Sequence, residues 1–246
     1  MRYSKILLFF FSLFSTSVYA SNLNSINNLF LNKENNFSIP LDILIIISSL
    51  SFLPALILLM TSFTRIIIVL SLLRNALGLS YAPPNQILIG LSLFITFFIM
   101  SPVFNSVYKD SYLPFVNRQI NSEKAIESAI LPFKKFMLNQ VKDSDISFFL
   151  KLSKNKDMKF KNKYDIPLYI VVPTFITNEL KISFQIGFML FVPFIVIDLI
   201  VSSVLMALGM MMVPPSSISL PFKLIIFVLA DGWHLLSRSL VESFYF

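Results

Sequence analysis

The sequence predicts an all-α, polytopic membrane-type protein built of helical hairpins, with a helical polar insertion between its second and third apolar runs. Of its 246 residues, 56% are hydrophobic and only 13% are charged, a balance too apolar for an ordinary soluble domain. The apolar residues gather in four long runs, at residues 43–73, 86–107, 184–208 and 218–241. Runs of this length and composition are typical of membrane helices.

Composition also limits the chemistry of the chain. Cysteine is absent and His234 is the single histidine, which excludes disulfides, thiolate nucleophiles, Cys/His zinc sites and Ser-His-Asp chemistry. The glycine-rich G-x-x-x-x-G-K-[ST] loop that holds nucleotide phosphates is also absent, so an energy source has to lie in a partner or in the membrane potential. We expect no catalytic residue, cofactor or metal site. The net charge of +7 comes largely from one polar segment and does not indicate a nucleic-acid partner.

The N-terminus has the pattern of a secretory signal peptide over residues 1–20. Arg2 and Lys5 precede a short apolar core, and small residues follow up to Ala20, where we expect cleavage. The alternative is an uncleaved membrane anchor, although the apolar core is short for a span. Residues 21–40 are rich in asparagine and weakly patterned, which indicates a flexible leader.

The first apolar hairpin is expected over residues 41–107. If residues 43–73 formed one helix, it would be about 45 Å long, whereas the hydrocarbon core of a membrane is about 30 Å thick. The run is therefore expected to break near Pro54 or Thr61, or to leave the bilayer into protein. The second apolar run of this hairpin covers residues 86–107.

Arg65 lies inside the first apolar run, where a charge at a helix centre costs roughly 2.5–3.5 kcal/mol on insertion scales. We expect its side chain to face an interface, a partner carboxylate or a cavity. In the alternative interpretation, Arg65 and Arg74 only mark the cytoplasmic end of the first span.

Residues 108–166 form the polar insertion. Ser122 is expected to begin an amphipathic helix that Pro132 interrupts, and Asp145 to cap a second helix. Lysines then recur over residues 151–163, a pattern typical of a solvated loop. A contact with acidic lipid or a partner protein is the alternative.

The second apolar hairpin is expected over residues 167–246, with Pro173 in the first turn of its first helix. Asp198 lies within the third apolar run and should be paired, hydrogen-bonded or neutral, because an isolated carboxylate is costly in lipid. The last run carries Lys223 near its start and Asp231 within it.

Between the third and fourth apolar runs lies a methionine-rich turn at residues 207–215. Its three consecutive methionines cannot share one helical face, and the turn is bounded by glycine and proline. The methionines are Met210, Met211 and Met212, and the loop-shaping residues are Gly209, Pro214 and Pro215. Flexible, polarizable thioethers suit a surface that has to seal around varied partners, although filling gaps between helices is the commoner role of methionine.

Residues 76–84 repeat the frame of this turn, because both segments read Ala-Leu-Gly, three variable residues, a small or branched apolar residue and Pro-Pro. The equivalent loop-shaping residues are Gly78, Pro83 and Pro84. We interpret the two segments as a weak internal repeat of a helical hairpin. With the signal peptide removed, the spans place the new N-terminus and the polar insertion outside. The Arg65 and Arg74 side and both Pro-Pro turns are then cytoplasmic.

Several stretches together resemble one family closely, and they cover most of residues 51–233. They are residues 53–55, 60–65, 74–78, 82–86, 98–102, 172–173, 175, 179–181, 184–188, 198, 206–215, 221–223 and 231–233. The family is FliP, the inner-membrane export-gate proteins of the flagellar type III secretion apparatus, which is related to the injectisome SctR family. The signal peptide favours the flagellar branch.

The resemblance implies a homo-oligomer that assembles with FliQ and FliR into a right-handed helical ring, with FlhB and FlhA as further partners. It implies a location in the bacterial inner membrane at the flagellar basal body, in contact with membrane lipid. The substrates would be unfolded flagellar proteins, around which Met210, Met211 and Met212 form a gasket. Glu179 and Lys223 match family positions associated with contacts between subunits.

Two other classes of function are compatible with parts of the sequence. A small secondary transporter would use Arg65, Asp198 and Asp231 as coupling charges. A membrane enzyme would have to work with carboxylates alone, since the usual catalytic groups are nearly absent.

Overall fold

The structure is a computed structural model that describes residues 48, 57–79, 81–153, 162–210 and 212–244. The predicted signal peptide and leader, most of the lysine-rich loop, and Met211 lie outside the described residues. By its internal contacts the chain divides into residues 1–50 and 51–246, and every helix named below belongs to the second unit. The described elements are all helical, which confirms the predicted all-α class.

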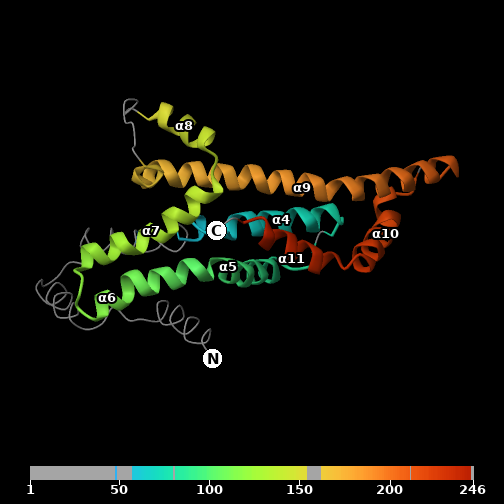
Figure 1. The fold of residues 1–246 in the computed structure, drawn as a ribbon. Helices are drawn as coiled ribbons and strands as arrows, with labels where there is room; N and C mark the ends of the chain where they lie inside the picture. Colours follow the sequence, from blue (N-terminus) through green and yellow to red (C-terminus); the bar gives the residue numbers. More distant parts are fainter. Residues whose placement is uncertain (1–47, 49–56, 80, 154–161, 211, 245–246) are drawn as a thin grey trace, which may run out of the picture. The chain divides into compact units, whose positions relative to one another are not determined.

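The first hairpin consists of α4 (Phe63–Ala76) and α5 (Asn85–Val107). A turn at Met60–Ser62 precedes α4, where the Thr61 hydroxyl donates to the carbonyl of Leu58 at 2.7 Å. The first apolar run therefore breaks at Thr61, one of the two predicted places. Helix α4 packs against both α5 and α9 and lies between them (Figure 1).

Helix α5 begins and ends within one residue of the predicted second run. Its helical path then continues through a π-helix (η1, Tyr108–Tyr112) into α6 (Leu113–Val116). The helix thus extends nine residues into the segment predicted as the polar insertion. Ser111 anchors the π-helix, because its hydroxyl donates to the carbonyl of Ala125 at 2.6 Å.

The polar part of the chain then forms α7 (Ser122–Gln140), α8 (Asp143–Leu152) and the short 3-10 helix η2 (Lys163–Asp165). Two predictions for this part are wrong. Helix α7 runs through Pro132 without interruption, because its buried face packs on α5 and α9 and overrides the local preference of proline. The residue before α8 is Lys142, and Asp145 instead lies in the first turn, where a carboxylate favours the positive end of the helix dipole.

Helix α9 (Leu168–Ala207) is one helix of 40 residues. Pro173 is its sixth residue, so the predicted position of Pro173 in the first turn is wrong. At 1.5 Å per residue the helix is about 60 Å long, about twice the thickness of a hydrocarbon core. Most of its buried residues precede residue 188, and several of them recur four apart along one face. They include Val171, Phe175, Glu179, Ser183 and Gly187. The N-terminal half of α9 therefore belongs to the protein core, and the C-terminal half is largely exposed.

The predicted last run is broken into α10 (Pro215–Leu229) and α11 (Gly232–Glu242), which meet at an angle of 64°. Asp231 adopts the left-handed conformation at the break, with φ 50°. A Cβ on Gly232 would lie 2.2 Å from the ring of Phe227, so any other residue at this position would force that ring to move. The last apolar run, residues 218–241, is therefore divided between two helices.

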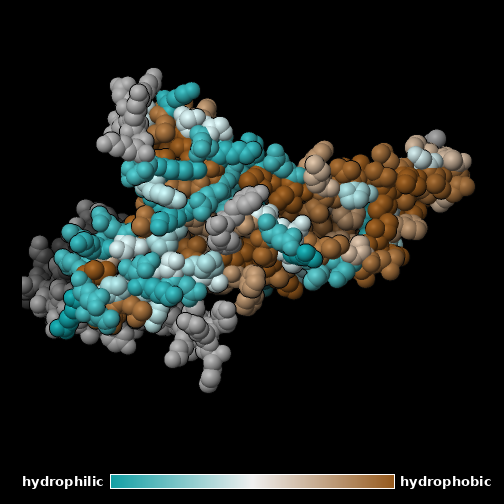
Figure 2. Space-filling view, in the orientation of Figure 1, coloured by the Kyte–Doolittle hydropathy of each residue, from teal (hydrophilic) through white to brown (hydrophobic). Residues whose placement is uncertain are grey.

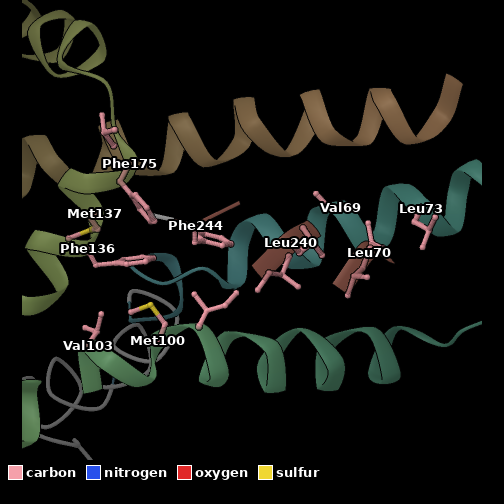
Figure 3. Close-up of a cluster of buried hydrophobic side chains, with 14 of the residues drawn as sticks. Val69, Leu70, Leu73, Met100, Val103, Phe136, Met137, Phe175, Leu240 and Phe244 are labelled. Carbon is pink, nitrogen blue, oxygen red and sulfur yellow. The ribbon is translucent and has the colours of Figure 1, made fainter. Parts of the chain in front are cut away.

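Among the described residues, two helical stretches are long and apolar enough to cross a membrane, Asn85–Val116 and Leu168–Ala207. The bent pair of α10 and α11 would be a third if it crosses as one span. Hydrophobic side chains gather over the C-terminal half of α9 and over α10, whereas hydrophilic ones gather over α6, α7 and α8 (Figure 2). Where α4, α5, α7, α9 and α11 meet, buried side chains form one hydrophobic core (Figure 3).

Candidate functional site

The two Pro-Pro turns have the same backbone pattern at the end of the helix that precedes them. After α4, the amides of Leu77, Gly78 and Leu79 donate to carbonyls four, three and five residues earlier. After α9, the amides of Leu208, Gly209 and Met210 repeat this pattern. Gly78 and Gly209 both adopt the left-handed conformation, with φ 78° and 74°, as in a Schellman motif that ends a helix.

The prolines then lead into the next helix of each hairpin. Pro84 directly precedes α5, after a cis peptide bond between Ala82 and Pro83. Pro214 directly precedes α10, and Pro215 is the first residue of that helix, where its missing amide hydrogen costs no bond. The repeated sequence frame thus corresponds to a repeated helix–turn–helix connection.

The methionine turn lies at the tip of the hairpin formed by α9 and α10 (Figure 1). The Met212 side chain is 97% exposed and that of Met210 is 43% exposed. Leu208, beside them, is also exposed. The described methionines of this turn therefore do not fill a gap in the core of this chain.

Arg65 and Glu179 form a buried ion pair between α4 and α9. The guanidinium donates from Nε to Oε2 at 2.7 Å and from Nη2 to Oε1 at 2.5 Å. Both side chains are almost completely buried, at 1% and 0% exposure. This two-pronged geometry uses the fixed fork of arginine and orients the two helices toward each other. The sequence predicted a carboxylate partner as one possibility for Arg65 but did not identify Glu179.

The end of α11 completes the surroundings of Arg65. Nη1 of Arg65 donates to the Ser243 carbonyl at 2.8 Å and to the Ser243 hydroxyl at 3.0 Å. The Phe244 ring lies over the guanidinium, with its centroid 3.8 Å from Cζ. Sequence reasoning missed both residues, because a backbone carbonyl at a helix end leaves no mark in the sequence.

An aromatic cluster connects this ion pair to the polar helices. Phe136 of α7 stacks on Phe244, with ring centroids 6.2 Å apart, and meets the edge of Phe175 of α9 at 6.0 Å. The labelled side chains of these three residues point toward one another in Figure 3. Arg65 of α4 is therefore connected to Phe136 of α7 through the Phe244 ring.

Arg74 lies at the opposite end of α4, beside the first Pro-Pro turn. Its Nη1 donates to the Asn85 side chain at 2.6 Å and to the Pro83 carbonyl at 3.3 Å. Arg65 and Arg74 therefore lie at opposite ends of α4, and whether both mark the cytoplasmic end of the first span stays a prediction.

Lys223 of α10 joins the two hairpins. Its ammonium donates to Oδ2 of Asp198 at 2.6 Å and to the carbonyl of Ala76, at the end of α4, at 3.3 Å. The Ser219 hydroxyl donates to the other oxygen of Asp198 at 2.6 Å. Lys223 is buried, whereas the side chain of Asp198 is 40% exposed. Within this chain, the carboxylate in the third apolar run is thus paired, as that part of the sequence reasoning expected.

The structure does not bring together the three charges of a transporter site. Arg65 pairs with Glu179, Asp198 pairs with Lys223, and Asp231 is an exposed residue whose carboxylate lies 3.7 Å from Nδ1 of His234. Within the described part of the chain, no group of three or more His, Cys, Asp or Glu side chains is close enough to hold a metal ion.

Comparisons with known proteins show which sequences this chain resembles. The FliP family model matches residues 46–240. Three proteins named flagellar biosynthetic protein FliP are similar over most of the chain. That of Buchnera aphidicola subsp. Acyrthosiphon pisum is 61% identical over 85% of this chain and 54% of its own length. Those of Pectobacterium carotovorum and Bacillus subtilis are 55% and 45% identical, over 87% and 90% of this chain and 82% and 100% of their own.

The chain spans little more than half the length of the two Buchnera relatives, at 54% and 58%. The match nevertheless covers all of the Bacillus subtilis protein, and the family model includes the Arg65–Glu179 pair, the Lys223–Asp198 pair and both Pro-Pro turns. From its helices, its repeated turns and these matches, the chain belongs to the FliP family.

Proposed function

We propose that this chain is a pore-forming core subunit of the flagellar type III protein export gate. In this proposal it is not an enzyme, and it passes unfolded flagellar proteins across the bacterial inner membrane at the basal body. Membership of a family of flagellar biosynthetic proteins supports the general role. The two hairpins, residues 41–107 and 167–246, contribute the wall, and the insertion of residues 108–166 lies on the extracytoplasmic side.

The observation that carries the gasket proposal is the exposure of the methionine turn. A methionine that filled a gap in its own subunit would be buried, whereas Met212 is 97% exposed at the tip of a hairpin. Gly209 in the left-handed conformation ends α9 abruptly, and Pro214 leads into α10, so the turn has a defined backbone on both sides. Unbranched thioethers adapt to many shapes, which suits a seal around polypeptides of varied sequence.

The proposal includes a homo-oligomer with FliQ and FliR, and FlhB and FlhA as further partners. The exposed apolar side chains of the C-terminal half of α9, such as Leu199, Ile200 and Val204, support contacts with lipid or with other subunits. The roles of Glu179 and Lys223 in subunit contacts stay predictions, since both side chains are engaged within this chain.

The gasket is tested by replacing Met210, Met211 and Met212 together with alanine in a motile bacterium whose own copy is deleted. We expect ion leakage through the gate to rise, because the shorter side chains cannot close the passage. The matched control is Met189→Ala, another exposed methionine, on α9 and away from the turn. Unchanged conductance and unchanged export of flagellar proteins in the triple variant would contradict the gasket.

The oligomer is tested with Met211→Cys, which introduces a unique thiol because the chain has no cysteine. If the turns converge on a common axis, oxidation links two copies of the chain through this position. Export that persists in the triple alanine variant, together with absence of this crosslink, would leave no support for a ring closed by methionines.

A further inference from the structure

The break between α10 and α11 uses a backbone conformation that is unfavourable for the residue that adopts it. Asp231 lies in the left-handed region, with φ 50° and ψ 48°, where a residue with a Cβ is less stable than in a right-handed helix. No proline follows Pro221 in the sequence, so the bend of 64° is not imposed by proline. Contacts elsewhere in the protein therefore have to stabilise it.

The bend allows two stripes of side chains to be buried at once. In α10 the buried residues recur four apart, at Ser219, Lys223 and Phe227. Along α11 and just beyond it, buried residues also recur four apart, at Leu236, Leu240 and Phe244. Nine residues separate the two stripes, which is about two and a half turns of a continuous α-helix. One straight helix would therefore point the two stripes in opposite directions.

The end of α11 is held by Arg65. Its guanidinium donates to the carbonyl and the hydroxyl of Ser243, and the Phe244 ring covers it and stacks on Phe136. A cation at the C-terminal end of a helix also lies at the negative end of the helix dipole. Leu240 is 1% exposed and belongs to the hydrophobic core (Figure 3). These contacts exist only while α11 is folded back, so they stabilise the left-handed Asp231.

Bending and docking are therefore one event. Once the end of α11 leaves Arg65, the docking contacts no longer offset the left-handed conformation, and Asp231 is more stable in a right-handed helix. Helices α10 and α11 then join over residues 215–242, a helix about 42 Å long. Together the two helices are long and apolar enough to be one membrane-crossing stretch.

We propose that α11 is a strap with two states. In the docked state, which this structure shows, the chain bends at Asp231 and the strap covers Arg65. In the undocked state α10 and α11 form one continuous helix. The stripe of Leu236, Leu240 and Phe244 then faces away from the rest of the chain, and Nη1 of Arg65 is uncovered. The inference concerns the chain by itself and does not rest on the export role.

The test measures the distance between two spin labels in the detergent-purified full chain by pulsed electron–electron double resonance. Because the chain has no cysteine, Ser216→Cys and Ser239→Cys place the labels at two exposed positions, one on each helix. Along the helix axes these positions are about 30 Å apart with the bend of 64° and about 35 Å apart in a continuous helix. We expect the shorter distance to be the main one in the otherwise unaltered chain.

Two substitutions should favour the continuous helix. Phe244→Ala removes the ring that covers Arg65, and Gly232→Ala places a Cβ against Phe227 and favours helix through the break. Each should raise the ratio of the longer to the shorter distance at least about tenfold, and in the double variant the longer distance should be the main one. The matched control, Phe148→Ala with Gly90→Ala, changes an exposed ring on α8 and an open position on α5, and should leave the ratio unchanged.

A double variant whose main distance stays the shorter one, or that has no defined distance, would overturn the proposal. So would the longer distance as the main one in the otherwise unaltered chain. If the double variant does not fold, Asp231→Ala and Asp231→Gly decide, because Asp231 is exposed and both variants lose the same side chain. Alanine is less stable than glycine in the left-handed region and favours a continuous helix. The ratio of the longer to the shorter distance should therefore be at least about fivefold higher in Asp231→Ala, and equal ratios would overturn the proposal.

Discussion

Replacing Glu179 with glutamine tests the structural role of the buried ion pair. The variant keeps the shape of the side chain but leaves the guanidinium of Arg65 facing a neutral amide. Because Arg65 is 1% exposed, water cannot take the place of the carboxylate. Removing one partner of such a buried pair costs about 3–5 kcal/mol. For a unit of this size each kcal/mol lowers the melting temperature by about 2–4 °C, so the expected loss is about 6–20 °C.

The chain offers both a probe and a control for this experiment. Trp233 is the single tryptophan and packs edge-on against Phe227, so its fluorescence reports unfolding of the detergent-purified protein. The control is Glu242→Gln, which breaks the same type of pair with Arg238, at a distance of 2.7 Å but on an exposed surface. We expect no measurable change in the control, since exposed pairs contribute little.

The double variant Arg65→Met with Glu179→Leu sharpens the result. It removes both charges, so no unpaired charge stays buried, and we expect it to melt above the Glu179→Gln variant. A Glu179→Gln protein that melts within about 2 °C of the unaltered chain would refute the reasoning, because the predicted minimum loss is about 6 °C. A double variant less stable than Glu179→Gln would equally refute the argument about the unpaired charge.

Three further predictions use the same melting assay. Gly78→Ala should lower the free energy of unfolding by about 1–2 kcal/mol, because Gly78 has a positive φ. The control Gly90→Ala, in the open interior of α5, should leave the free energy of unfolding unchanged or raise it by up to about 1 kcal/mol. Equal losses in the two variants would contradict this reasoning. Gly187→Ala should lower the free energy of unfolding by about 1–3 kcal/mol, because the new Cβ lies 2.2 Å from the Leu72 side chain. Adding Leu72→Ala should recover part of this loss, and a double variant without recovery would argue against the clash. Phe244→Leu removes the ring over the buried guanidinium and should lower the melting temperature by about 4–8 °C, and an unchanged value would count against the cation–π contact.

The sequence predicted the backbone well where a residue type strongly favours one conformation. Gly78 and Gly209 before Pro-Pro pairs predicted two turns, and both glycines have the expected positive φ. The ends of α5 were predicted within one residue, because its apolar run has clear polar boundaries. By contrast, Pro132 and Pro173 suggested a break and a helix start, but both lie within helices that tertiary packing maintains.

The sequence alone could not predict which side chains far apart in the chain contact each other. An arginine in an apolar run requires some partner, but the choice of Glu179, 114 residues away, depends on how α4 crosses α9. The contact with Ser243 depends on the bend before α11, and a left-handed Asp231 is not encoded by any simple pattern. The methionine turn was recognised because unusual composition and loop-forming residues coincide there.

The ammonium of Lys223 acts as a pin between the hairpins, because it holds Asp198 of α9 and the last turn of α4 at once. Beyond this pin, α9 continues for nine residues, or about 13 Å, and only Leu205 is buried there. The end of α9 that carries the methionine turn can therefore tilt at the Lys223 contact while the rest of the protein stays packed. In the proposed gate, the part of the chain that a passing polypeptide displaces would be this end of α9 with the methionine turn.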